Sequence, residues 1–145
     1  MATRYMPEGY HTVTPYLVVR GAGELIEFMK QAFQGQEKER HMRPDGAVMH
    51  AEVRIGDSIV MLGDASDQSP AAPASLHLYV EDVDATYQRA KQAGGESLRE
   101  ATDQFYGDRS AGIKDRFSDQ WWLATHIEDV PPEEMQRRQA AMAQA

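Results

Sequence analysis

Two alternating runs of apolar and polar residues meet at a Gly-Asp pair in AVMHAEVRIGDSIVML, residues 47–62. Alternation with a period of two is typical of a strand with one buried face, and turn residues between two such runs predict a hairpin. A second turn, Pro44-Asp45-Gly46, separates this hairpin from residues 37–42. We therefore expect three consecutive antiparallel strands.

The residues before these strands predict a strand followed by a helix. Residues 10–19 are rich in β-branched and aromatic side chains, which favour a strand. Residues 21–33 carry apolar side chains at helical spacing, which predicts a helix with one apolar face. The predicted order is strand, helix, strand, strand, strand.

The same order begins again in the second half of the chain. A predicted strand over residues 75–81 leads to Asp82, a suitable N-cap for a helix that ends at Gly94-Gly95. The triplets Lys30-Gln31-Ala32 and Lys91-Gln92-Ala93 stand at the same point of the two helices, which indicates an internal duplication. Further strands are expected over residues 96–101, 110–114 and 120–127.

The sequence thus predicts an α+β fold of two βαβββ modules that form one cupped mixed sheet. We expect a single domain over residues 1–145, because a chain of this length can bury one core. Its predicted parts are module one at about residues 8–64, module two at about 74–128, and a C-terminal helix at about 131–143.

The composition excludes several classes of function. The formal net charge is -8 and the basic residues are scattered among carboxylates, so no nucleic-acid partner is expected. The absence of cysteine excludes disulfides, thiolate metal sites and cysteine nucleophiles. No apolar run could span a membrane and no apolar leader opens the chain, so we expect a cytoplasmic protein without a membrane partner.

Strand parity sorts the side chains onto two faces. In residues 47–55 every second side chain from Met49 onward is apolar, so the helices are expected to cover this set. His50 and Glu52 then project together from the opposite, open face. Such a pair suits acid–base chemistry, which makes both the predicted catalytic residues. The same rule assigns more residues to the open face: Thr14, Tyr16, Ser75, His77, Tyr79, Trp122, Ala124 and His126.

Four segments resemble the PhnB-like branch of the vicinal oxygen chelate (glyoxalase, bleomycin-resistance and dioxygenase) superfamily. They are TVTPYLVV (12–19), MHAEVRIGDS (49–58), LHLYVEDVDA (76–85) and LATHIEDV (123–130). The resemblance implies the duplicated βαβββ fold and a protein that binds a small anionic or aromatic molecule in the cup of the sheet. Many relatives are homodimers, so a homodimer is expected on the resemblance alone.

Enzymes of this superfamily usually hold a divalent metal with four side chains from the first and last strands of the two modules. The resemblance places these residues there: Thr14, Met61, Ser75 and Trp122. None offers an imidazole or a carboxylate, so the usual metal centre is predicted to be absent and no cofactor is expected. The alternative is a displaced divalent-metal site with these ligands: His50, Glu52, His77 and His126.

The predicted ligand-binding residues are aromatic or charged: Tyr16, His77, Tyr79, Tyr106, Arg109 and Trp122. Arg109 either anchors an anion through its bidentate fork or forms a structural ion pair with a carboxylate, and both interpretations stay open. Trp122 stands where the branch commonly has a small serine, so its ring stacks on an aromatic ligand or narrows the cup. Whether a reaction is catalysed is left open. Alternatives are a metal-dependent lyase, isomerase or dioxygenase, and a resistance protein that sequesters an antibiotic.

Overall fold

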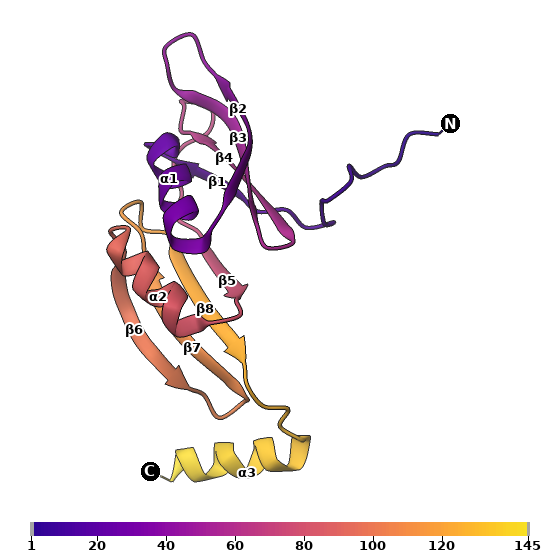
Figure 1. Cartoon of the computed structure of the whole chain (residues 1–145), viewed down its shortest axis with the longest axis vertical. Helices are drawn as coiled ribbons and strands as arrows, with labels where there is room; N and C mark the ends of the chain where they lie inside the picture. The colour runs from indigo at the N-terminus through magenta and orange to yellow at the C-terminus, as the bar shows by residue number, and fades with distance from the viewer. Residues whose placement is uncertain (1, 145) are drawn as a thin grey trace.

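The computed structural model describes residues 2–144, which form two similar modules and a C-terminal helix (Figure 1). The first module consists of β1 (Tyr16–Val19), α1 (Ala22–Phe33), β2 (Gln36–Met42), β3 (Val48–Ile55) and β4 (Ser58–Asp64). The second consists of β5 (Ser75–Tyr79), α2 (Val83–Gln92), β6 (Glu96–Asp103), β7 (Asp108–Lys114) and β8 (Gln120–His126). Helix α3 (Pro132–Ala143) follows. The predicted α+β fold of two βαβββ modules is confirmed.

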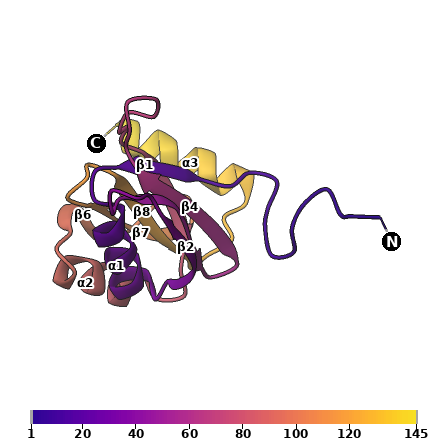
Figure 2. The ribbon, with the colours of Figure 1, turned by 90° about the horizontal axis from the view of Figure 1, so that it is seen from above.

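Each module has its own four-stranded mixed sheet, in the order β1-β4-β3-β2 in sheet 1 and β5-β8-β7-β6 in sheet 2. The first strand of each module pairs with the last in parallel, and the other pairs are antiparallel. The predicted single cupped sheet is therefore two sheets, which lie end to end (Figure 1). Helices α1 and α2 pack against each other on one side of the strands, and α3 lies across the strands from them (Figure 2).

Helix α1 follows from its apolar stripe, since Leu25, Ile26, Met29 and Ala32 are fully buried. The helix has no side-chain cap of its own at Gly21, whose φ of 118° suits glycine. In α2 the cap is local, because the Asp82 side chain accepts a hydrogen bond from the amide of Ala85.

One core joins the two modules. Trp121 of β8 is 0% exposed, and its ring lies 4.8 Å from that of Phe33 and 6.5 Å from that of Phe28, both on α1. Aromatic rings at these separations add to the stabilisation from burial alone. Trp121 is therefore a central residue of the core that joins the two modules.

Two local predictions are wrong. Residues 10–15 are not part of a strand: β1 begins at Tyr16, after Pro15, whose ring nitrogen has no hydrogen to donate. Met49, placed with the buried set by simple alternation, is 56% exposed, whereas Val48 is buried. The pairing of β2 with β3 shifts register beside this point, and such an irregularity moves the following side chain to the other face.

Helix α3 has no buried residue and is held to module two through Arg138, which pairs with Glu128 and donates to the carbonyl of Phe105. Among residues 2–144 no helix combines the length and the hydropathy that a membrane-spanning segment needs.

Candidate functional site

The open face of sheet 1, opposite α1, carries a row of side chains that runs across all four strands. The register pairs Tyr16 of β1 with Met61 of β4, Met61 with Glu52 of β3, and Glu52 with Glu39 of β2. Directly opposite side chains on one face are close enough to interact. The row thus brings two of the predicted residues, Tyr16 and Glu52, to the same surface.

Glu52 is the buried centre of this surface. It is only 4% exposed and accepts hydrogen bonds from the hydroxyl of Tyr10 and from Nε2 of His50, the latter at 2.8 Å. Burial raises the pKa of Glu52, but the bonds from His50 and Tyr10 outweigh this effect and leave the pKa below its ordinary value. The hydrogen bond to Glu52 raises the pKa of Tyr10 to about 12. At neutral pH, Glu52 is therefore an ionised acceptor and Tyr10 a neutral donor.

His50 lies between Glu52 and Tyr16. Its Nδ1 lies 3.3 Å from the Tyr16 hydroxyl, and the two rings are 5.6 Å apart. A Cβ atom at Gly63 of β4 would come within 3.1 Å of the Tyr16 hydroxyl, so the glycine leaves the space through which Tyr16 reaches His50. The predicted pair His50 and Glu52 is thus in direct contact, with Tyr16 on the other imidazole nitrogen.

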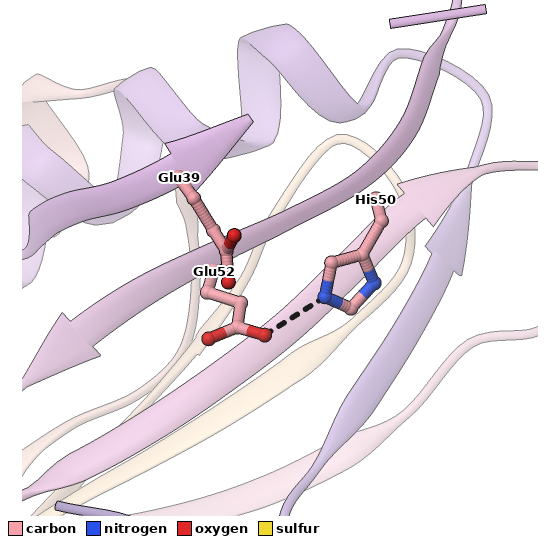
Figure 3. A group of neighbouring side chains, drawn as sticks. All are labelled: Glu39, His50 and Glu52. Carbon is pink, nitrogen blue, oxygen red and sulfur yellow. Dashed lines mark hydrogen bonds and ion pairs between the residues drawn. The ribbon is translucent and has the colours of Figure 1, made fainter. Parts of the chain in front are cut away.

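Two residues of β2, which the sequence interpretation did not include, complete this group. Glu39 lies opposite Glu52, and His41 lies opposite His50. One ligand atom from each of Glu39, His50 and Glu52 lies within 4.8 Å of the others (Figure 3). Nε2 of His41 lies 2.9 Å from Oε2 of Glu39. The signal in the sequence is a Glu-x-His and a His-x-Glu on either side of the Pro44-Asp45-Gly46 turn.

The open face of sheet 2, opposite α2, has a second network centred on a buried carboxylate. Asp108 of β7 is 4% exposed, accepts a hydrogen bond from the Tyr79 hydroxyl at 2.9 Å, and lies 2.8 Å from Nδ1 of His126. These bonds raise the pKa of Tyr79 and, together with a bond to Asp129, the pKa of His126. The His77 ring packs edge-on against Tyr79 with the ring centroids 5.0 Å apart.

Trp122 forms an aromatic platform on the same face. The ring lies over Gly112 of β7, where an added Cβ would come within 2.4 Å of it. The guanidinium of Arg99, from β6, sits 5.2 Å from the ring centre and donates a hydrogen bond to Ser110. Within residues 2–144 no carboxylate forms an ion pair with Arg99, so the charge is available to a ligand. Sequence reasoning missed Arg99, because β6 has two register irregularities that disturb strand parity.

Arg109 pairs with carboxylates of α2 and β6 instead, whereas Tyr106 lies near Tyr79. The guanidinium of Arg109 binds both carboxylate oxygens of Asp84 on α2, at 2.8 and 2.9 Å, and donates to Asp103 at 3.0 Å. The hydrogen bonds that Arg109 donates to these two carboxylates raise its pKa. This is the ion-pair interpretation of Arg109 that the sequence left open. Tyr106 packs edge-on against Phe105 in the turn before β7.

Two cavities flank these surfaces. A groove of about 1360 Å³ runs between the modules and is lined by the β3–β4 turn, β5 and the start of α2, with His77, Tyr79 and Arg54 among its residues. A smaller cavity of about 430 Å³ lies beside Tyr16 and Met49. The two predicted tyrosines, Tyr16 and Tyr79, thus line different cavities of the chain.

Comparison with known proteins assigns the family. A sequence model of the Glyoxalase/Bleomycin resistance protein/Dioxygenase superfamily matches residues 10–123. The chain belongs to this superfamily. The chain is also similar to an uncharacterised protein of Mycobacterium bovis, 36% identical over 135 residues that cover 86% of this chain and 89% of the relative.

Solved structures share the superfamily fold. TioX from Micromonospora sp. ML1 matches with a TM-score of 0.69 and 20% identity, over 81% of this chain and 99% of TioX. A PhnB protein from Bacillus cereus matches with a TM-score of 0.64 and 19% identity, over 79% of this chain and 99% of the PhnB protein. At these identities the likeness shows a common fold and leaves the function to be argued from the site.

The four residues that the sequence resemblance places at the usual metal positions do not offer the donors of a divalent-metal site. The Thr14 hydroxyl donates to the carbonyl of His11, and Met61 lies between Tyr16 and Glu52 in the sheet 1 row. Ser75 pairs with Gln120, and Trp122 forms the platform over Gly112. A thioether, two hydroxyls and an indole are not the donors that a hard or borderline cation requires.

The displaced metal set expected from the sequence is divided between the sheets. His50 and Glu52 lie on β3 of sheet 1, whereas His77 lies on β5 and His126 on β8 of sheet 2. Of the three histidines in this set, His50 and His126 each already contact a carboxylate of their own sheet. One chain therefore does not bring these four ligands together.

Proposed function

We propose that this superfamily member is a PhnB-like protein of the cytoplasm that binds a small aromatic anion on the open face of sheet 2, without a metal at the usual positions. The observation that carries the proposal is the pairing of an aromatic platform with an unpaired cation. The guanidinium of Arg99 lies over the Trp122 ring, 5.2 Å from its centre, so an aromatic ring and a cation stand together on this face. A ligand with a ring and a carboxylate or phosphonate would use both.

The neighbouring side chains support an aromatic ligand. Tyr79 is 66% exposed although its ring is large and apolar, and His77 packs against its edge. Exposed aromatic rings beside a platform are what a binding surface for a flat molecule requires. In this arrangement Arg99 takes the anchoring role that the sequence suggested for Arg109, which Asp84 and Asp103 occupy.

A homodimer is part of the proposal, because the predicted residues lie on two open faces. Tyr16, His50 and Glu52 belong to sheet 1, and Tyr79 and Trp122 belong to sheet 2. A second copy placed across these faces would enclose the ligand between sheet 1 of one chain and sheet 2 of the other. In that cup, the predicted catalytic pair His50 and Glu52 would face the ligand.

The test uses 1-naphthoate and its neutral analogue 1-naphthamide as probes, with binding measured by calorimetry. We expect wild-type protein to bind the anion at least tenfold more tightly than the amide, a difference of about 1.4 kcal/mol. Arg99→Gln should remove this preference, and Trp122→Ser should weaken both probes. Arg116→Gln is the matched control, since Arg116 is an exposed arginine that pairs with Glu24. Equal affinity of wild-type protein for both probes, or equal behaviour of the two arginine variants, would contradict the proposal.

A further inference from the structure

Four side chains on the hairpin of β2 and β3 form a group on sheet 1, apart from the Trp122 and Arg99 pair on sheet 2. We call them the Glu–His hairpin: Glu39, His41, His50 and Glu52. The hydrogen-bond register places Glu39 opposite Glu52 and His41 opposite His50, so two imidazoles and two carboxylates share one face of two neighbouring strands. The order of the residues is mirrored about the turn between the strands.

We propose that the Glu–His hairpin binds one divalent cation of the zinc class. Imidazole nitrogen and carboxylate oxygen are the donors that zinc and its neighbours in the first transition row accept. Two ligands on one such ion are at most about 4.2 Å apart, since each lies about 2.0–2.2 Å from the metal. The ligand atoms of Glu39, His50 and Glu52 already lie within 4.8 Å of one another, so side-chain movements of about an ångström would bring them into the range of a tetrahedral site.

The group also has the outer partners that metal ligands need. The Tyr16 hydroxyl lies on Nδ1 of His50 and leaves Nε2 to point at Glu52. The Tyr10 hydroxyl holds Oε1 of Glu52 and leaves Oε2 on the side of His50. Such contacts fix the orientation of ligating side chains, and their loss commonly weakens metal binding.

Electrostatics favour a cation at this place. Glu39 and Glu52 lie directly opposite each other, and like charges in this position destabilise a pair of strands. The nearest ammonium group belongs to Lys38, which lies 3.4 Å from the Tyr10 hydroxyl and packs over the Tyr10 ring. A cation among the four side chains would neutralise both carboxylates and replace the proton shared by His50 and Glu52.

The exposure of the four side chains defines the kind of site. The Glu52 side chain is 5% exposed and that of His50 28%, whereas those of Glu39 and His41 are 43% and 55% exposed. One side of the ion would therefore face water, as in metal sites that keep a position for a small ligand. The inference goes beyond the proposed aromatic-anion site, because none of these residues lies on sheet 2.

The test uses full-length protein without an affinity tag, titrated with Zn²⁺ by calorimetry and with Co²⁺ by visible absorption. We expect one equivalent of either metal to bind, with Co²⁺ bands that report nitrogen and oxygen ligands. His50→Asn should abolish the Co²⁺ bands. Glu39→Gln and His41→Asn change half-exposed side chains and so keep the fold, and each should weaken Zn²⁺ at least tenfold.

His126→Asn is the matched control, because His126 also lies between two carboxylates but on sheet 2. Three outcomes would overturn the inference. They are saturable metal binding that survives in His50→Asn, an equal weakening of metal binding in His126→Asn, and a wild-type protein that binds no metal. The naphthoate titration of the same variants separates this outcome from the proposed ligand site, because changes in the Glu–His hairpin leave Trp122 and Arg99 in place.

Discussion

Asp64 connects three segments of the first module through its two carboxylate oxygens. Oδ1 accepts from the amides of Gly21 and Ala22 at the start of α1, both at 2.8 Å, and Oδ2 accepts from the amide of Val48 at 2.7 Å. Burial raises the pKa of Asp64, but the three backbone hydrogen bonds and the nearby Arg43 outweigh it and leave the pKa below its ordinary value. The carboxylate thus acts as the cap that α1 lacks locally.

Asp64→Ala should lower the free energy of unfolding by about 2–4 kcal/mol, because three amides lose their acceptor. Urea denaturation at pH 7 measures this loss. Asp64→Asn keeps one carbonyl oxygen, so its free energy of unfolding should lie between those of wild type and Asp64→Ala. A lowered folded-state pKa gives stability that is present above the unfolded pKa and is lost as pH falls through the folded pKa. The gap between wild type and Asp64→Asn should therefore shrink in acid. A gap that is constant with pH would contradict this role for the charge.

Some contacts of single residues could be predicted and others could not. The contact of His50 with Glu52 follows from strand parity, because residues two apart on a strand project to the same side. Glu39 and His41 depend on the register between β2 and β3, which the hydrophobic pattern of an exposed strand does not define. Asp108 was missed because β7 begins at Asp108, two residues before the predicted strand.

The connection between β7 and β8 contains two buried carboxylates, Asp115 and Asp119. Asp119 is fully buried, and its Oδ1 accepts from the amide of Ala74 at 2.8 Å. Asp115 accepts from the amide of Asp119 and from the indole of Trp121. Burial, with the nearby Asp115 charge, raises the pKa of Asp119 to about 6. Near neutral pH the connection must hold a second negative charge in the core.

The free energy of unfolding of Asp119→Asn, relative to that of wild type, should be higher at pH 7.5 than at pH 4.5. Urea denaturation of both proteins at the two pH values measures this. A raised folded-state pKa gives stability that is complete below the unfolded pKa and is lost as pH rises through the folded value. The loss in wild type is about 1–3 kcal/mol over this range. The amide keeps the acceptor for Ala74 and removes the titration. An equal difference between the two proteins at both pH values would refute this account.

The regular elements were predicted better than the irregular ones. The helix expected over residues 21–33 is α1, and the three strands after it are β2, β3 and β4, because apolar periodicity and turn residues agree there. Residues 10–15 have the composition of a strand, yet the pairing of β1 with β4 begins only at Tyr16. Composition records how well side chains fit a sheet, and it does not record whether a neighbouring strand is present.

For the molecule as a whole, the sequence predicted two modules but not how they meet. A single cupped sheet would need hydrogen bonds between edge strands of the two modules, and the sheets instead stay separate. The modules are joined by the packing of α1 with α2 and of Trp121 with Phe33, which are contacts between faces. Strand parity is a local rule. It brought His50 and Glu52 to one face, failed at Met49 beside a register shift, and gave no information on distances between the two sheets.

Several large apolar side chains are exposed on or beside the open faces. Tyr16 is 47% exposed, Met49 56% and Tyr79 66%, and Ile127, just after β8, is 51% exposed. Exposed apolar side chains that gather into a patch commonly mark contacts with another protein. A second copy that buries about 800 Å² on each chain would be a stable interface of standard size.

Sedimentation equilibrium of the wild-type protein at micromolar concentration should give twice the chain mass of 16.3 kDa. Met49→Glu and Ile127→Glu place a charge in the expected interface and should shift the equilibrium toward monomer by at least tenfold, because an unpaired buried carboxylate is costly. Gln31→Glu is the control, since Gln31 is an exposed residue of α1 on the opposite side of the sheet. A monomeric wild-type protein, or equal association of all variants, would contradict the dimer. If the protein is a monomer, the ligand would bind an open surface at Trp122. The protein would then cover the ligand ring on one side only, and the affinity for naphthoate would be correspondingly weak.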